Sequence, residues 1–162
     1  MHRLVAVLLG ALTAAGPGGL RAAENTFILG VHPDLVAGAE ALHLGRFEQG
    51  IAHTLSGLAA VVTPQQRASG LNNLCAGYTA LRQYDIAIVY CSASLEIDPG
   101  SWQVYNNRAL AYLGKGVTGL AQRDVRRGLE LNPEAESLRK VERMVDEALR
   151  RKEPGRDPDT IA

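Results

Sequence analysis

The sequence predicts an all-α fold made of repeated helical units, and three observations support this prediction. Similar residues return at a step of 34 along the middle of the chain. Ala and Leu recur throughout, while aromatic residues make up only 5% of the sequence, which suits close-packed helices better than a β-sandwich. Near the C-terminus, apolar residues fall at steps of three and four, the spacing of one helical stripe.

Length and charge limit the classes of function. The chain has 162 residues, the size of one domain, and 46% of them are hydrophobic, so it can bury a core. Its 17 basic residues are matched by 17 acidic residues. This balance gives no general electrostatic reason to bind nucleic acid or an anionic membrane, so neither is expected as a partner.

Residues 1–22 have the order of a signal peptide. A short basic start precedes 12 uncharged, mostly apolar residues, and small residues then lead to Ala23. The apolar run is shorter than the roughly 20 residues of a membrane span. We expect cleavage after Ala22, a short N-terminal segment at 23–30, and export to the periplasm or outside, as in bacteria, with no stable membrane insertion afterwards. A retained anchor and a buried N-terminal helix are the alternatives.

Two consecutive stretches, 68–101 and 102–135, are copies of each other. The matching residues are 34 positions apart: Asn72-Asn73 and Asn106-Asn107, Tyr78 and Tyr112, Ala87 and Ala121, Leu95 and Leu129, Pro99 and Pro133. A more diverged copy covers about 31–64, at a step of 37 from the second. One unit of this kind cannot cover its own apolar face, so about three must stack.

The period and the small residues at fixed places resemble the tetratricopeptide repeat (TPR) family. Positions 8, 20 and 27 of the units, which are small in that family, hold Gly38, Cys75 and Ala109; Gly50, Ala87 and Ala121; and Gly57, Ser94 and Gly128. The resemblance implies a right-handed solenoid of about three helix–turn–helix units over 31–151. Arg108 departs from the family's usual Leu, and Pro64 is displaced from the place where Pro99 and Pro133 end their units.

The residues after the third unit are suited to ending the stack. Residues 134–151 have one apolar stripe and a charged opposite face, which favours a C-terminal capping helix over a partner-binding amphipathic helix. Residues 152–162 combine two Pro, one Gly and several charges, which is typical of a disordered tail.

The resemblance also implies a binding site on the concave face, which the first helix of each unit lines. The side chains expected there in the second and third units are mostly small or amides: Ser69, Asn72, Asn73, Gln103, Asn106, Asn107 and Leu110. An Asn amide donates and accepts, so it can pair with the main chain of an extended peptide, or it can brace neighbouring helices. Chaperone-binding members need Lys or Arg at positions 2 and 6, where this chain has neither, so capture of a C-terminal carboxylate is not expected.

Cys75 and Cys91 are the two cysteines of the chain. In a helix hairpin that turns near Gln83, each lies eight residues from the turn, so antiparallel helices bring both to the same height. Ala87, one turn before Cys91, faces the first helix, and Cys75 occupies the small position that faces the second. We therefore expect a disulfide if the compartment is oxidising; two reduced, buried thiols are the alternative.

No motif indicates catalysis, a cofactor or a metal. The segment from Gly114 to Gly119 spells G-x-G-x-x-G, but a helical pattern precedes it where a dinucleotide site needs a strand, so we expect a helix–helix turn. The four His residues lack the spacing of a metal site, and no nucleophile motif occurs. We therefore expect no catalytic residues, no cofactor and no metal.

These observations favour a non-catalytic adaptor that binds a protein or peptide in the concave groove. One alternative is a structural or self-assembling subunit of a cell-envelope complex. Another is an enzyme whose site the sequence does not reveal. The sequence does not identify the partner, the pathway or the oligomeric state.

Overall fold

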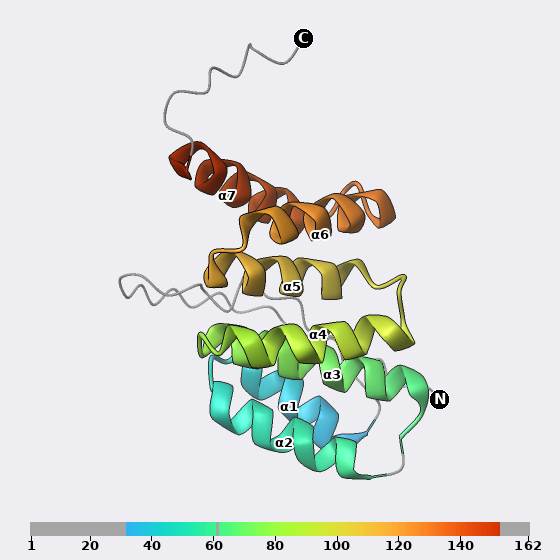
Figure 1. The fold of residues 1–162 in the computed structure, drawn as a ribbon. Coiled ribbons are helices and arrows are strands. Elements are labelled where there is room, and N and C mark those ends of the chain that lie inside the picture. The colour runs from blue at the N-terminus through green and yellow to red at the C-terminus, as the bar shows by residue number, and fades with distance from the viewer. Residues whose placement is uncertain (1–31, 61, 153–162) are drawn as a thin grey trace.

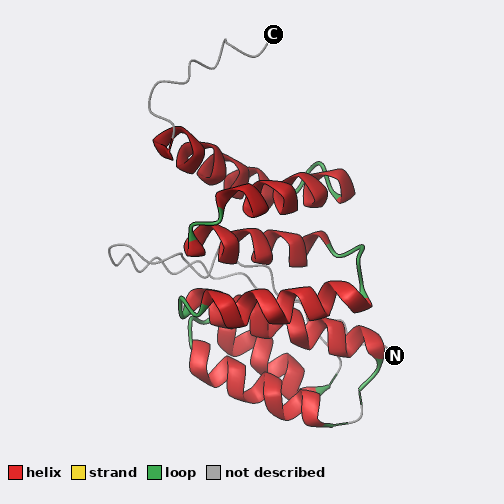
Figure 2. Ribbon diagram, in the orientation of Figure 1, coloured by secondary structure: helices red, strands yellow, loops and turns green. Residues whose placement is uncertain are grey.

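The structure, a computed structural model, describes residues 32–60 and 62–152. The expected signal segment 1–22, the segment 23–30 and residues 153–162 of the expected tail lie outside this part of the chain. The described residues form seven α-helices and no strand (Figure 2). The helices are α1 (Pro33–His43), α2 (Phe47–Ala59), α3 (Pro64–Ala80), α4 (Tyr84–Ile97), α5 (Trp102–Lys115), α6 (Thr118–Leu131) and α7 (Glu136–Lys152).

The helices are stacked in the order of the chain (Figure 1). Three hairpins, α1–α2, α3–α4 and α5–α6, pack on one another through the α2–α3 and α4–α5 contacts, and α7 covers α6. The first helices also touch in series, α1 on α3, α3 on α5 and α5 on α7, so they form one continuous layer. The predicted all-α fold, with three helix–turn–helix units and a capping helix, is confirmed.

Each hairpin turns at the same repeat position through the left-handed backbone region. Gly45 has φ 74°, Gly116 has φ 84°, and Arg82 has φ 61° at the equivalent place in the second unit. Gly adopts this conformation without a Cβ clash, whereas Arg82 bears a steric cost of about 1 kcal/mol. Gly116 caps the C-terminus of α5, and α6 follows at Thr118, so the G-x-G-x-x-G segment does join two helices.

Pro64 begins α3 rather than ending the first unit, so α3 starts before the expected unit boundary at 68. The reason is a local capping box. The Gln66 N–H donates to Thr63 Oγ1 at 3.2 Å, and the Thr63 N–H donates to Gln66 Oε1 at 2.8 Å. Because Pro at the first helical position lacks the N–H that would be unpaired there, Thr63-Pro64 starts a helix efficiently.

Small residues let the two helices of each hairpin approach closely. A Cβ added to Gly38 on α1 would lie 2.3 Å from Thr54 Oγ1 and 3.0 Å from the Gly50 carbonyl oxygen on α2. The equivalent residues Cys75 and Ala109 are fully buried. The small positions identified from the sequence are therefore the contact points between helices.

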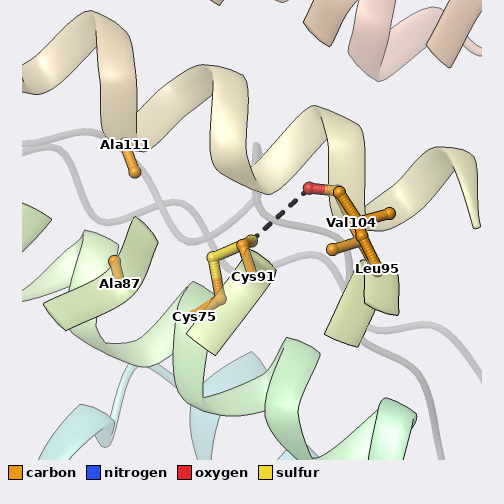
Figure 3. Packing of buried hydrophobic residues seen from close by; sticks show 6 residues of the cluster. All are labelled: Cys75, Ala87, Cys91, Leu95, Val104 and Ala111. Carbon is orange, nitrogen blue, oxygen red and sulfur yellow. Dashed lines mark hydrogen bonds between the residues drawn. A yellow bond between two sulfur atoms is a disulfide. The ribbon is translucent and has the colours of Figure 1, made fainter. Parts of the chain in front are cut away.

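Cys75 on α3 and Cys91 on α4 form a disulfide, with their Cα atoms 5.2 Å apart, so the predicted pairing is confirmed. Figure 3 shows the bond inside a buried cluster that also contains Ala87, Leu95, Val104 and Ala111. The Cys91 sulfur lies 3.5 Å from the Val104 carbonyl oxygen on α5. Because a disulfide sulfur carries no proton, this is a packing contact between units rather than a hydrogen bond.

Candidate functional site

Four Asn side chains come together where α3 and α5 meet. Asn72 and Asn73 lie on α3, and Asn106 and Asn107 lie on α5; all four are fully buried. The Asn107 Nδ2 donates to Asn72 Oδ1 at 3.0 Å, and the Asn106 Nδ2 donates to Asn107 Oδ1 at 3.3 Å. The repeat therefore places amides from two units in one hydrogen-bonded row, and the bracing role considered from the sequence is present for Asn72 and Asn107.

The other three expected groove residues lie in two kinds of surroundings. Ser69 on α3 and Gln103 on α5 are partly exposed, at equivalent positions of their units. Leu110 is fully buried in an apolar cluster with Ala109, Ala121, Val125, Val141 and Val145. Leu110 is therefore part of the core of the third unit, because α6 and α7 close over its side of α5. The assignment of the seven residues to a partner-binding groove stays a prediction.

A polar cluster around Arg108 was not among the sites predicted from the sequence. The Arg108 guanidinium donates to both carboxylate oxygens of Asp124 at 2.8 Å and to Ser92 Oγ at 3.1 Å. It also lies 5.7 Å from the Tyr105 ring centre and 5.9 Å from that of Tyr112. Burial lowers the pKa of Arg108, but the hydrogen bond and charge of Asp124 outweigh this effect, so the pKa stands above its ordinary value.

The signal for this cluster was present in the repeat. The residues equivalent to Arg108 and Asp124 in the second unit are Leu74 and Tyr90. Arg108 and Asp124 both depart from the apolar pattern, carry opposite charges and lie 16 residues apart. This combination indicates one ion pair between the two helices of a unit. In the second unit, Tyr90 instead stacks on Tyr78, with ring centres 5.4 Å apart and planes 5° apart. Burial first, and then the neighbouring Tyr90, raise the pKa of Tyr78.

The outer helices α2 and α4 expose apolar side chains. On α4, the exposed fractions are 44% for Ile86, 66% for Val89 and 37% for Ile97, and these residues share one face of the helix. On α2, Leu55 is 43% exposed. Ile86, Val89 and Ile97 therefore form an exposed apolar stripe on α4.

The described residues contain no group of three or more His, Cys, Asp or Glu side chains that could hold a metal ion. None of the described helices is both long enough and apolar enough to cross a membrane.

Comparison with known proteins identifies the fold. No family model matches the sequence. The chain is 26% identical over 136 residues to mouse sperm-associated antigen 1, covering 84% of this chain and 14% of that protein. A 67-residue stretch is 36% identical to mouse serine/threonine-protein phosphatase 5, covering 41% of this chain and 13% of that protein. The chain therefore spans only a small part of the length of either relative.

Among solved structures, the first TPR domain of human RPAP3 matches with a TM-score of 0.68 and 23% sequence identity, over 78% of this chain and 100% of that one. The chain has the TPR fold. The first TPR of Spaghetti (RPAP3), bound to the HSP90 peptide SRMEEVD, matches with a TM-score of 0.65 and 21% identity, over 72% of this chain and 92% of that one. In TPR terms, the amide row spans the first helices of the second and third repeats.

Proposed function

We propose that this protein is a non-catalytic TPR module that binds a segment of another protein along its layer of first helices. The observation that carries the proposal is the continuous layer of first helices, α1 on α3, α3 on α5 and α5 on α7, in which the buried amide row of Asn72, Asn107 and Asn106 fixes α5 against α3. Support also comes from the TPR of Spaghetti, which has the same fold and whose structure contains an HSP90 peptide. Ser69 and Gln103, which are partly exposed, mark where a partner first meets this layer.

The partner that fits this chemistry is an uncharged extended segment rather than an acidic C-terminus. Positions 2 and 6 of the units hold polar or apolar residues without a formal positive charge: His32, Ser69 and Gln103, and Val36, Asn73 and Asn107. The SRMEEVD peptide carries two Glu and a terminal Asp, which call for Lys or Arg. An amide can instead donate to a main-chain carbonyl and accept from a main-chain N–H of the same segment.

Partner capture from the native compartment tests this proposal. We expect bait carrying Ser69→Glu/Gln103→Glu to lose partner recovery by about tenfold, because new carboxylates at the edge of the layer repel main-chain carbonyls without altering the Asn row. Gln49→Ala, on exposed α2, is the matched control and retains recovery. Unchanged recovery with the double variant, at an unchanged circular dichroism spectrum, places the site elsewhere.

A second arm tests the Asn row itself. Asn73→Ala/Asn107→Ala removes amides from both units, and we expect it to lose recovery as well. Because Asn107 also bonds to Asn72, the thermal unfolding of this double variant is measured in parallel. Full recovery by this folded variant would exclude the row from binding.

Dilution separates the adaptor from a self-assembling subunit. The exposed stripe of Ile86, Val89 and Ile97 gives self-association a possible surface. For an adaptor we expect one sedimentation mass over a hundredfold range of concentration. A mass that rises with concentration and falls with Val89→Lys would favour the structural role.

We also propose that the protein acts outside the cytoplasm after cleavage near Ala22. Support comes from the pairing of Cys75 with Cys91, since disulfides persist mainly in oxidising compartments. N-terminal sequencing of native protein tests this, with a start near Ala23 expected. Intact Met1 in a cytosolic fraction would contradict it.

A further inference from the structure

The C-terminal end of the stack has a cleft between α6 and α7. Its volume is about 340 Å³, and both helices contribute to its lining. Its floor is apolar, formed by Val125, Leu129 and Val145, while its rim is polar and charged, formed by Gln122, Arg126, Glu130, Glu142 and Asp146. Figure 1 shows α6 and α7 as the last two helices of the stack.

The repeat shows which helix reaches the edge of the equivalent cleft. The main lining residues have counterparts 34 positions earlier on α4 and α5: Cys91, Leu95, Ala111, Ser92, Arg108 and Tyr112. There, α6 packs beside α5, and Arg108 on α5 bonds both to Ser92 on α4 and to Asp124 on α6. Arg108 thus marks the corner where three helices meet. By equivalence, Glu142 on α7 lies where the second helix of an additional unit would contact α6 and α7.

The residues that follow in this chain are poorly suited to supply that helix. One repeat step beyond α6, the equivalent stretch starts at Lys152 and includes Pro154, Gly155 and Pro158. Pro in a helix interior removes a hydrogen bond and clashes with the preceding turn. Residues 153–159 also carry three acids and one base, the same sign of charge as the excess at the cleft. These residues are therefore poorly matched to the cleft in both helix propensity and charge.

The charge of the cleft specifies its occupant. Glu130 is already bonded to Arg127 at 2.8 Å. The other charged side chains of the lining are the two carboxylates of Glu142 and Asp146 and the one guanidinium of Arg126. The two carboxylates lie one turn apart on α7, and within the described residues neither forms an ion pair. Glu142 replaces Arg108, whose partner on the next helix is a carboxylate. A helix that binds in this cleft must therefore present Lys or Arg to Glu142, where α6 presents Asp124 to Arg108.

We propose that the α6–α7 cleft binds a basic amphipathic helix of a partner protein, which continues the stack as its next second helix. Its apolar stripe rests on Leu129, the partly exposed residue of the floor, and its basic residue bonds to Glu142 and Asp146. This surface is separate from the layer of first helices, so it does not depend on the amide row.

The probe is a helix-stapled peptide with the sequence of α6, residues 118–131, tested with Asp at position 124 and with the Asp124→Lys change. Stapling on the face away from the floor is needed because a helix of this length is marginal in water. Binding to the full protein is followed through the methyl resonances of Val125 and Val145. We expect the Lys peptide to bind at least about tenfold more tightly than the Asp peptide.

Charge reversal in the protein completes the experiment. Glu142→Lys should reverse the preference, so that the Asp peptide becomes the tighter ligand, while Glu48→Lys on exposed α2 leaves the preference as in the unchanged protein. Equal affinities for the two peptides, no shift of the two methyl resonances, or no reversal by Glu142→Lys would each overturn the proposal. Ser69→Glu/Gln103→Glu should retain peptide binding, which separates this site from the layer of first helices.

Discussion

Arg108 on α5 holds Asp124 on α6 by two hydrogen bonds of 2.8 Å, at the positions where the preceding unit has Leu74 and Tyr90. The third unit thus replaces an apolar pair with an ion pair at the same contact between its helices. The side chains are only 19% and 8% exposed, so each charge depends on the other for compensation.

Removing one partner of this pair should destabilise the fold. We expect Asp124→Ala to lower the free energy of unfolding by about 2 kcal/mol, less than for a fully buried pair because Arg108 reaches solvent. Arg108→Leu/Asp124→Tyr, which copies the second unit, should recover most of the loss. Urea denaturation measures these variants together with the single changes Arg108→Leu and Asp124→Tyr. A double variant that loses as much as the two single changes together would show that the positions do not act as a pair.

Reduction of the Cys75–Cys91 disulfide should lower the free energy of unfolding by about 3 kcal/mol. The two residues are 16 positions apart, and a loop of this size restricts the unfolded chain by about that amount. Denaturation with and without a reductant measures the effect in protein whose thiols are counted. Cys75→Ala/Cys91→Ala is the control and should not respond to reductant. Superimposable curves for oxidised and fully reduced protein would refute the expectation.

Two glycines in helices should respond in opposite ways to Ala. Gly38→Ala places a Cβ 2.3 Å from Thr54 Oγ1 and 3.0 Å from backbone atoms of α2, so the helices must separate, at a cost of about 2 kcal/mol. Gly119→Ala on α6 meets no atom within 4 Å and should gain about 0.5 kcal/mol from helix propensity. Thermal unfolding compares them. Equal effects would mean that α1 and α2 do not meet at Gly38.

Stability at alkaline pH should depend on Tyr78. Burial and the neighbouring Tyr90 raise the pKa of Tyr78 above its ordinary value of 10.0, so the folded state favours the neutral phenol. This contribution is fully present below the unfolded-state pKa and is lost as pH rises through the raised, folded-state pKa. Tyr78→Phe should therefore lose less stability than the unchanged protein between neutral and strongly alkaline pH. Parallel declines in the two proteins would contradict this.

Local pattern was enough to predict most of the fold. The 34-residue step and the small positions indicated where helices touch, and the turn near Gln83 placed Cys75 beside Cys91. These features depend on residues close in sequence within one hairpin, where helix geometry converts spacing into direction. The one local error, at Pro64, came from matching it to the end of a repeat instead of to the capping box with Thr63 and Gln66.

Tertiary structure decided the features that join different helices. Asn107 bonds to Asn72 across 35 positions of sequence, and Leu110 lies in the core because α6 and α7 close over it. An amide in sequence fits a groove or a brace equally well, since both need a donor and an acceptor. The stack adds the bond between Asn72 and Asn107 because the packing of α3 on α5, which no single helix encodes, sets their separation and orientation, while their role in partner binding stays a prediction.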